Sequence, residues 1–183
     1  MHYLRVIIIF ICLSITTAIA HTTTAIKNTK EIVFKSITTL NGSLNKKTAE
    51  LYANIIDKYS HKYGVDPLLV VAIAKQEGNF ILNKKNYQEV YDEKGKIRRV
   101  ITDYCMMQIN KSNLVSMKLN PKKLLTDPDY CIKTGVKILA SLKSYSRYEK
   151  NWWSRYNSVS IKNRNIYKKN VLHFYRKISF ELV

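Results

Sequence analysis

The sequence predicts a mainly α fold: a single helical domain with one small β-hairpin insertion. Apolar residues recur at helical spacing over most of the chain, and an Asp-Pro pair precedes two of these segments. Between residues 83 and 102 the pattern changes, because two β-prone runs flank a polar turn. Residues 21–183 are enough for one domain with a hydrophobic core and too few for two.

The first twenty residues have the features of a secretory signal peptide. One cation, Arg5, precedes an apolar run over residues 6–15, and Ala18-Ile19-Ala20 is typical of a cleavage site. The run is shorter than the roughly 18 residues that a membrane-spanning helix needs, so we expect no stable membrane anchor. The sequence therefore predicts an exported protein that is periplasmic or secreted.

The chain is strongly basic, with 31 Lys and Arg against 13 Asp and Glu and a formal net charge of +18 at pH 7. Such a charge favours a polyanionic partner: nucleic acid, an anionic membrane surface or an acidic cell-wall polymer. Export makes nucleic acid the weakest of the three, and we expect no nucleic-acid partner. The cations are dispersed along the chain, so part of the charge also fits ordinary solvated surface.

Residues 21–47 are rich in Thr, Lys and Asn, and we expect them to form a weakly structured N-terminal segment before a domain over residues 48–183. A first helix is predicted from Thr48 to Tyr63, because its aromatic and aliphatic residues fall on one face. Gly64 is expected to end this helix.

The central helix of the domain is predicted over residues 66–80. Asp66 is suited to cap its N-terminus, and Pro67 fits the first helical position. Seven apolar residues follow, which indicates a helix buried on every side. Glu77 comes at its end, just before Gly78, where burial would raise the pKa of the carboxyl towards that of a general acid. The alternative is that Glu77 belongs to a solvated last turn.

The rest of the chain is predicted to alternate short irregular segments with helices. The hairpin of residues 83–102 turns at residues 92–95, and residues 103–110 show no helical period. A second Asp-Pro pair, Asp127-Pro128, opens another helix, and residues 151–157 form a short aromatic segment. The last helix is expected over about residues 163–179, with a core stripe that consists of Tyr167, Val171, Phe174 and Ile178.

Two cysteines, Cys105 and Cys131, remain after the predicted signal peptide. An even number of cysteines in an exported protein favours a disulfide, which would stabilise the fold by about 3–4 kcal/mol. The alternative is a thiol nucleophile at Cys105 working with His173, although neither residue lies in a recognisable cysteine-hydrolase motif. The histidines are isolated and no glycine-rich phosphate loop is present, so we expect neither a metal nor a cofactor.

Four segments, in order along the chain, resemble the lysozyme-like domain of soluble lytic transglycosylases. Residues 66–80 resemble the family's Pro-Leu-Leu-x-Ala-Ile-x-x-x-Glu-Ser helix, and residues 103–110 resemble its Gly-Leu-Met-Gln-Ile-Asn segment. Residues 127–139 resemble a helix with an Asp-Pro, Asn-Ile and Gly-x-x-x-Leu signature, and residues 156–157 begin a Tyr-Asn-x-Gly segment. The resemblance covers about residues 48–178. It is closest to the small transglycosylases that accompany type III and type IV secretion systems.

The resemblance implies an α+β lysozyme-like fold and a peptidoglycan substrate. The implied reaction cleaves the MurNAc–GlcNAc β-1,4 bond and leaves a 1,6-anhydro end, with Glu77 acting first as acid and then as base. Met107 and Gln108 are implied to line the groove near the cleaved bond. The Tyr156 hydroxyl is implied to approach Glu77, and Asn157 to contact the acetamido group of the substrate.

Asp103 is the candidate for a second carboxylate in the site. If Asp103 faces Glu77 across the cleft, a hydrolytic, lysozyme-like route becomes possible. Otherwise Asp103 serves as a structural cap or hydrogen-bond acceptor near the Gln108 segment.

The sequence also departs from the family pattern at positions near the implied site. Gly78 replaces Ser, Cys105 replaces Gly, Cys131 replaces Asn, and Val159 stands where a Gly is expected. The two cysteines thus fall at unusual positions, which favours a bridge between them. Two alternatives to the transglycosylase stay open: a hydrolytic muramidase on the same fold, and a catalytically weak peptidoglycan-binding accessory protein. We expect a monomer, and the resemblance implies service to a secretion or export machine.

Overall fold

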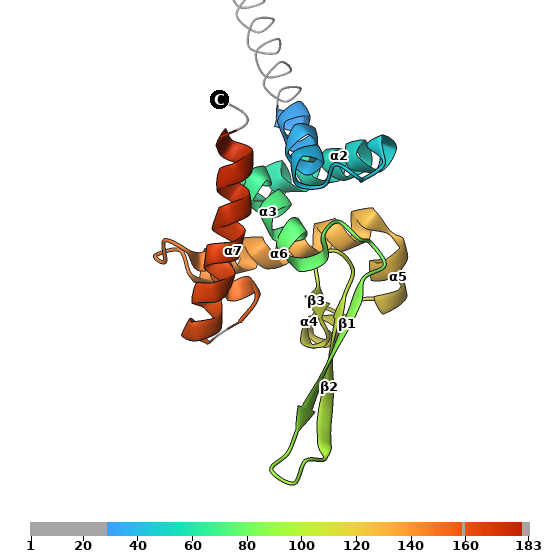
Figure 1. Cartoon of the computed structure of the whole chain (residues 1–183), viewed down its shortest axis with the longest axis vertical. Helices are drawn as coiled ribbons and strands as arrows, with labels where there is room; N and C mark the ends of the chain where they lie inside the picture. The colour runs from blue at the N-terminus through green and yellow to red at the C-terminus, as the bar shows by residue number, and fades with distance from the viewer. Residues whose placement is uncertain (1–28, 159, 181–183) are drawn as a thin grey trace, which may run out of the picture.

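The computed structural model describes residues 29–158 and 160–180, so the predicted signal peptide lies outside the described residues. These residues form a mainly helical fold with a small three-stranded antiparallel sheet, which confirms the predicted fold class (Figure 1). The named elements are α2 (Lys46–Tyr63), α3 (Pro67–Gly78), β1 (Lys85–Tyr91), β2 (Ile97–Tyr104), β3 (Ile109–Asn110), α4 (Lys111–Ser116), α5 (Pro121–Thr126), α6 (Pro128–Tyr145), the 3₁₀ helix η1 (Trp152–Tyr156) and α7 (Ile161–Phe180).

The expectation of a weakly structured segment over residues 21–47 is wrong for its described part. Residues 29–40 form a helix, and α2 already begins at Lys46. Val33 and Ile37 are fully buried and Leu40 nearly so, because their spacing puts all three on the helix face that joins the core. The folded part of the chain therefore begins well before residue 48.

The central helix α3 is buried as predicted. The Asp66 carboxylate caps it by accepting from the Leu68 amide at 2.9 Å, and the buried run over residues 69–74 is at most 7% exposed. Asp66 also accepts from the Tyr175 hydroxyl at 2.7 Å, which ties α7 to the start of α3. Among the named elements, α3 packs mainly on α7 and α2 packs mainly on α6. These four helices enclose most of the core and fix the position of the end of α3.

The predicted hairpin is confirmed and projects away from the helices (Figure 1). Strands β1 and β2 pair antiparallel from Lys85↔Tyr104 to Tyr91↔Ile97, with one irregularity after Val90. At the turn, Gly95 takes a left-handed φ of 73°. At its base, β2 also pairs with the short β3, so the root of the hairpin is held beside the end of α3 by the segment that joins β2 to β3. No helix of the described residues is long and apolar enough to cross a membrane.

Candidate active site

Glu77 lies in the last turn of α3, where the helix emerges from the core. Asn79 ends the helix in the left-handed conformation, with φ 49° and its amide bonded to the Lys75 carbonyl. The Lys84 ammonium donates to the Glu77 main-chain carbonyl at 2.7 Å, which satisfies one of the carbonyls left free at a helix C-terminus. The backbone around Glu77 is therefore fixed on both sides.

The surroundings of Glu77 raise the pKa of its carboxyl to about 7. Burial is the largest cause, because desolvation penalises the charged form, and the negative charge of Asp103 adds to it. The Tyr167 hydroxyl and the Lys84 ammonium act in the opposite direction and lower this pKa. A carboxyl with such a pKa is present in both protonation states near neutral pH, as acid–base catalysis requires.

One oxygen of the Glu77 carboxyl has no hydrogen-bond partner among the described residues. The same holds for the Tyr167 hydroxyl, although it lies close enough to lower the pKa of the carboxyl. Both atoms are buried, and a buried polar atom without a partner is costly unless a ligand or water completes it. Glu77 also lines a space open to a ligand, and Tyr167 lines a smaller cavity beside that space.

That space is a cleft with a volume of about 570 Å³, bounded by the end of α3, the root of the hairpin, α4, η1 and the start of α7. Its lining is rich in amide side chains, and Glu77 and Asp103 are its carboxylates. The lining residues are Glu77, Asn86, Gln88, Ile101, Asp103, Gln108, Asn110, Ser112, Asn113, Arg155, Tyr156, Asn157, Ser158 and Asn163. A smaller cavity, with a volume of about 200 Å³, adjoins it and shares Asn157 and Asn163. Amides can donate to and accept from hydroxyl and acetamido groups, so this lining suits a glycan.

Asp103 lies in β2 at the root of the hairpin and lines the cleft with Glu77. Its carboxylate accepts from the Asn110 amide at 2.7 Å, across the pairing of β2 with β3. Burial raises the pKa of Asp103, while the hydrogen bond from Asn110 lowers it. Asp103 therefore makes a structural hydrogen bond and also lies in the same cleft as Glu77, so the two alternatives considered for it are not exclusive.

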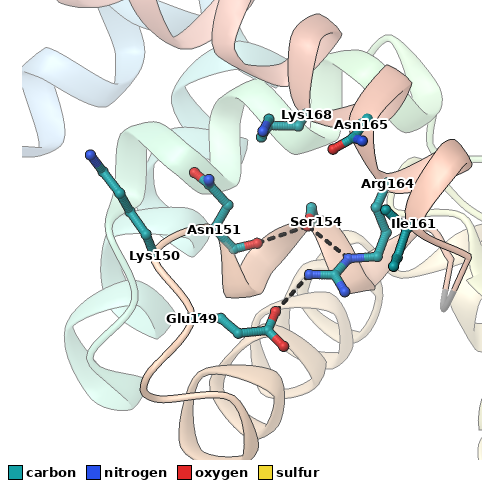
Figure 2. Close-up of a pocket in the computed structure, with 8 residues that line it drawn as sticks. All are labelled: Glu149, Lys150, Asn151, Ser154, Ile161, Arg164, Asn165 and Lys168. Atoms are coloured by element: carbon teal, nitrogen blue, oxygen red, sulfur yellow. Dashed lines mark hydrogen bonds and ion pairs between the residues drawn. The ribbon is translucent and has the colours of Figure 1, made fainter.

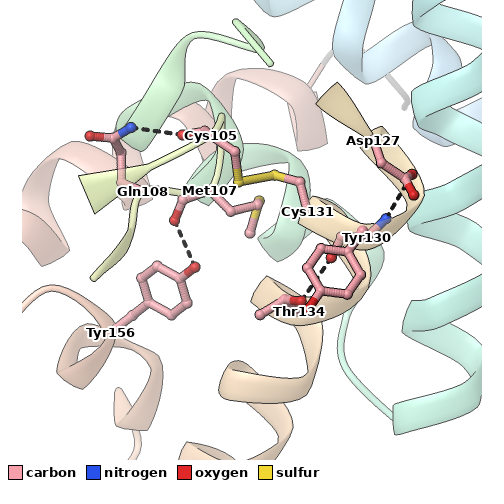
Figure 3. The surroundings of a disulfide bond; sticks show 8 residues. All are labelled: Cys105, Met107, Gln108, Asp127, Tyr130, Cys131, Thr134 and Tyr156. Atoms are coloured by element: carbon pink, nitrogen blue, oxygen red, sulfur yellow. Dashed lines mark hydrogen bonds between the residues drawn. A yellow bond between two sulfur atoms is a disulfide. The ribbon is translucent and has the colours of Figure 1, made fainter. Parts of the chain in front are cut away.

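A tight loop over residues 105–108 closes the inner wall of the cleft. The predicted disulfide is present between Cys105 and Cys131, which joins this loop to α6 (Figure 3). Cys105 and Gln108 both have a positive φ, 62° and 45°, and the Gln108 side chain donates to the Cys105 carbonyl at 2.7 Å. Because Cys105 is bonded to Cys131, the alternative of a free thiol nucleophile is wrong for this structure.

Gly78 packs directly against this loop. A Cβ placed on Gly78 would lie 2.4 Å from both the Cα and the carbonyl oxygen of Met106, which is closer than atoms can approach. The replacement of the family's Ser by Gly thus has a packing explanation in this chain. The replacement of Gly by Cys at position 105 is likewise explained by the disulfide to Cys131.

Comparison with protein families identifies the domain. Residues 54–170 match the model of the family described as Transglycosylase SLT domain. The chain belongs to this family. One solved structure, of a point mutant of the protein named Bd0314 DslA, is 16% identical and covers 66% of this chain and 68% of its own, with a TM-score of 0.36. Comparison with curated proteins gave no match.

Of the SLT-domain residues predicted for the site, five line the cleft together: Glu77, Asp103, Gln108, Tyr156 and Asn157. The prediction that Met107 lines the groove is wrong. The Met107 side chain is fully buried and fills the space over Gly135 in α6, beside the disulfide (Figure 3). The loop conformation turns only its carbonyl outward, and that carbonyl accepts from the Tyr156 hydroxyl at 2.8 Å.

Tyr156 and Tyr167 share the environment of the Glu77 carboxyl. Tyr156, whose hydroxyl was predicted to approach Glu77, lies near enough for the charge of Glu77 to add to burial in raising the pKa of Tyr156 well above its usual range. Its hydrogen bond, however, goes to Met107. Tyr167, expected only as a core residue of α7, is the tyrosine whose hydroxyl lies near enough to the Glu77 carboxyl to lower its pKa. No sequence signal separates it from the other twelve tyrosines.

Sequence reasoning also missed the amides that the hairpin and α7 contribute to the cleft, such as Asn86, Gln88 and Asn163. Asn86 and Gln88 face the cleft because alternate residues of a strand share a face. Among the described residues, no group of three or more His, Cys, Asp or Glu is arranged to hold a metal ion.

Proposed function

We propose that this SLT-domain protein is a peptidoglycan lytic transglycosylase that cleaves the MurNAc–GlcNAc β-1,4 bond with Glu77 as its acid and base. The observation that carries the proposal is a carboxyl whose pKa is raised to about 7, at the wall of an amide-rich cleft, in a chain of this family. The residues that would bind the glycan around it are Gln108, Tyr156, Asn157 and Asp103.

In the first step the protonated Glu77 carboxyl donates its proton to the glycosidic oxygen, and the bond to the muramyl C1 breaks. The positive charge that develops at C1 is stabilised by the substrate's own acetamido group, which Asn157, a lining residue of the cleft, would orient. The Glu77 carboxylate then removes the proton of the muramyl C6 hydroxyl as its oxygen attacks C1. The product is a 1,6-anhydro end, and Glu77 returns to its protonated state.

The Tyr167 hydroxyl supports the second half of this cycle. By lowering the pKa of Glu77, it favours the carboxylate that must exist between proton donation and proton recovery. Burial and Asp103 favour the protonated form that begins the cycle. One carboxyl can serve both steps because these opposed influences leave its pKa near neutral.

A hydrolytic muramidase is the second candidate, favoured by the position of Asp103 in the same cleft. In that reaction water attacks in place of the C6 hydroxyl, and Asp103 acts as the second carboxylate. A catalytically weak binding protein has less support, because the Gly78 and Cys105 departures that prompted it have packing explanations. An exported or periplasmic location, service to a secretion machine and a monomeric state remain proposals that follow from the sequence.

The deciding experiment digests purified peptidoglycan with the wild type, Glu77→Gln and Asp103→Asn, and identifies the soluble products by mass spectrometry. A transglycosylase gives products one water lighter at the muramyl end. Its turnover falls by at least about 10² in Glu77→Gln and persists in Asp103→Asn. If the wild type releases products with a reducing end and both variants fail to release them, the protein is a muramidase. Binding to peptidoglycan with no soluble product from the wild type would contradict both.

A further inference from the structure

A second cavity, with a volume of about 260 Å³, lies between the loop that precedes η1 and the first half of α7 (Figure 2). One side is formed by α7 residues and the other by the loop that precedes η1, with Ser154 of η1 between them. Its lining residues are Glu149, Lys150, Asn151, Ser154, Ile161, Arg164, Asn165 and Lys168, and none of them lines the cleft.

The cavity has a fixed floor built around the Glu149 carboxylate. Glu149 is bound by two guanidinium groups, Arg155 and Arg164, with the Arg164 Nη2 atom 2.6 Å from the carboxylate. The hydrogen bond from Arg155 is the largest cause that lowers the pKa of Glu149, to about 2, so this carboxyl stays ionised. Arg164 also donates from Nε to the buried Ser154 hydroxyl at 3.1 Å. These bonds hold the floor in place without a ligand.

The charge of the cavity is positive because its one lining carboxylate is already paired twice. Lys150 and Lys168 also line the cavity, and neither forms an ion pair with any residue in the described part of the chain. Asn151 and Asn165 add amide donors. Figure 2 shows Lys168 on the α7 side of the cavity and the Lys150 side chain at its rim, directed away from Arg164. Ammonium and amide groups are donors that bind a carboxylate or a phosphate, and the Lys150 side chain must turn inward to take part.

The cavity and the catalytic cleft share their dividing wall. Within η1, Ser154 lines the cavity while Arg155 lines the cleft, and at the start of α7, Asn163 lines the cleft while Arg164 lines the cavity. A glycan strand in the cleft would therefore place its attached peptides near this second cavity. Those peptides carry carboxylates, so the adjoining strand is the source of anions that the position favours.

We propose that this cavity binds a carboxylate of the peptide stem attached to the glycan strand, through Lys150 and Lys168 over the Arg164 floor. The proposal rests on the proposed function, because the strand in the cleft brings the stem to the cavity. It adds a specificity element to the enzyme: strands that carry stems are bound more tightly than bare glycan. The same donors would accept inorganic phosphate, so the test must separate the two anions.

The direct test is calorimetric titration of the free stem peptide, released from sacculi by an amidase, into the intact Glu77→Gln protein. The same titration is made after adding Lys150→Gln and Lys168→Gln, which remove two cations and keep both side chains polar. We expect at least about tenfold weaker peptide binding, since charge-assisted hydrogen bonds are lost. A matched control, Lys122→Gln with Lys137→Gln, removes two exposed cations that line neither cavity and leaves the affinity unchanged.

A kinetic test compares kcat/KM of the otherwise wild-type enzyme on intact strands and on strands stripped of their stems. Lys150→Gln with Lys168→Gln should lower kcat/KM only on intact strands. If the wild type cleaves neither substrate, the proposed function fails, and the titration still decides the cavity. The cavity proposal is overturned if the peptide does not bind, if inorganic phosphate binds in its place, or if the variant and its control bind the peptide equally.

Discussion

The contact between Gly78 and the Met106 backbone predicts that Gly78→Ala is destabilising. The added Cβ would meet the Met106 Cα and carbonyl oxygen at 2.4 Å, so backbone must move. The loop cannot shift freely, because the neighbouring Cys105 is bonded to Cys131. Such overpacking costs about 3 kcal/mol, and better helix propensity of Ala returns about 1 kcal/mol. The net loss is about 2 kcal/mol, or a Tm lower by about 4–8 °C.

Thermal and urea unfolding of the oxidised protein measure this loss, with Gly42→Ala as the matched control. A Cβ on Gly42 would have only one neighbour, the Thr38 carbonyl oxygen at an ordinary 3.7 Å, so this variant should unfold within about 0.5 kcal/mol of the wild type. Gly78→Ser, which restores the family residue, should lose stability as Gly78→Ala does. If Gly78→Ala is as stable as Gly42→Ala, the close packing described for this loop is wrong.

Three further predictions concern Glu77 and the disulfide. Turnover should fall as pH rises through about 7, because Glu77 loses the proton that it donates. Tyr167→Phe should move this fall to higher pH, because the Tyr167 hydroxyl lowers the pKa of Glu77; an unchanged pH–rate profile would exclude that role. The free energy of unfolding should also fall by up to about 3 kcal/mol as pH rises from about 4.5 to 7, because the folded state binds the Glu77 proton more tightly than the unfolded state does. Urea unfolding of Glu77→Gln across the same pH range should show no such fall. Replacing Cys105 and Cys131 by Ser should cost about 3.5 kcal/mol, the loop entropy for a separation of 26 residues, and a Tm unchanged by reduction would contradict it.

The central helix could be predicted because its signals are local. Asp66 and Pro67 define where it begins, and the apolar run that follows leaves no polar face, so burial follows from composition alone. The candidate role of Glu77 as acid and base could not be inferred from this helix alone. It depended on the order of four motifs along the chain. The raised pKa of Glu77 follows from its place at the end of a buried helix, which is why sequence and structure agree there.

The orientation of Met107 could not be predicted, because it depends on backbone conformations that the sequence does not signal. Cys105 and Gln108 take positive φ angles, which side chains other than Gly adopt infrequently. These angles turn the Met107 side chain into the core and its carbonyl towards Tyr156. The helix over residues 29–40 was missed for a different reason: its buried face is narrow, and the polar residues around it resemble a linker.

The raised pKa of Glu77 comes from its position more than from any one partner. The last turn of α3 brings the carboxyl to the C-terminal end of a helix, where the helix dipole also disfavours negative charge. Lys84 could have cancelled this effect by pairing with the carboxylate, but it binds the main-chain carbonyl of Glu77 instead. The cation therefore steadies the helix end while leaving the carboxyl oxygen free of a paired charge. A direct salt bridge would have held Glu77 ionised and removed the proton that the proposed cleavage needs.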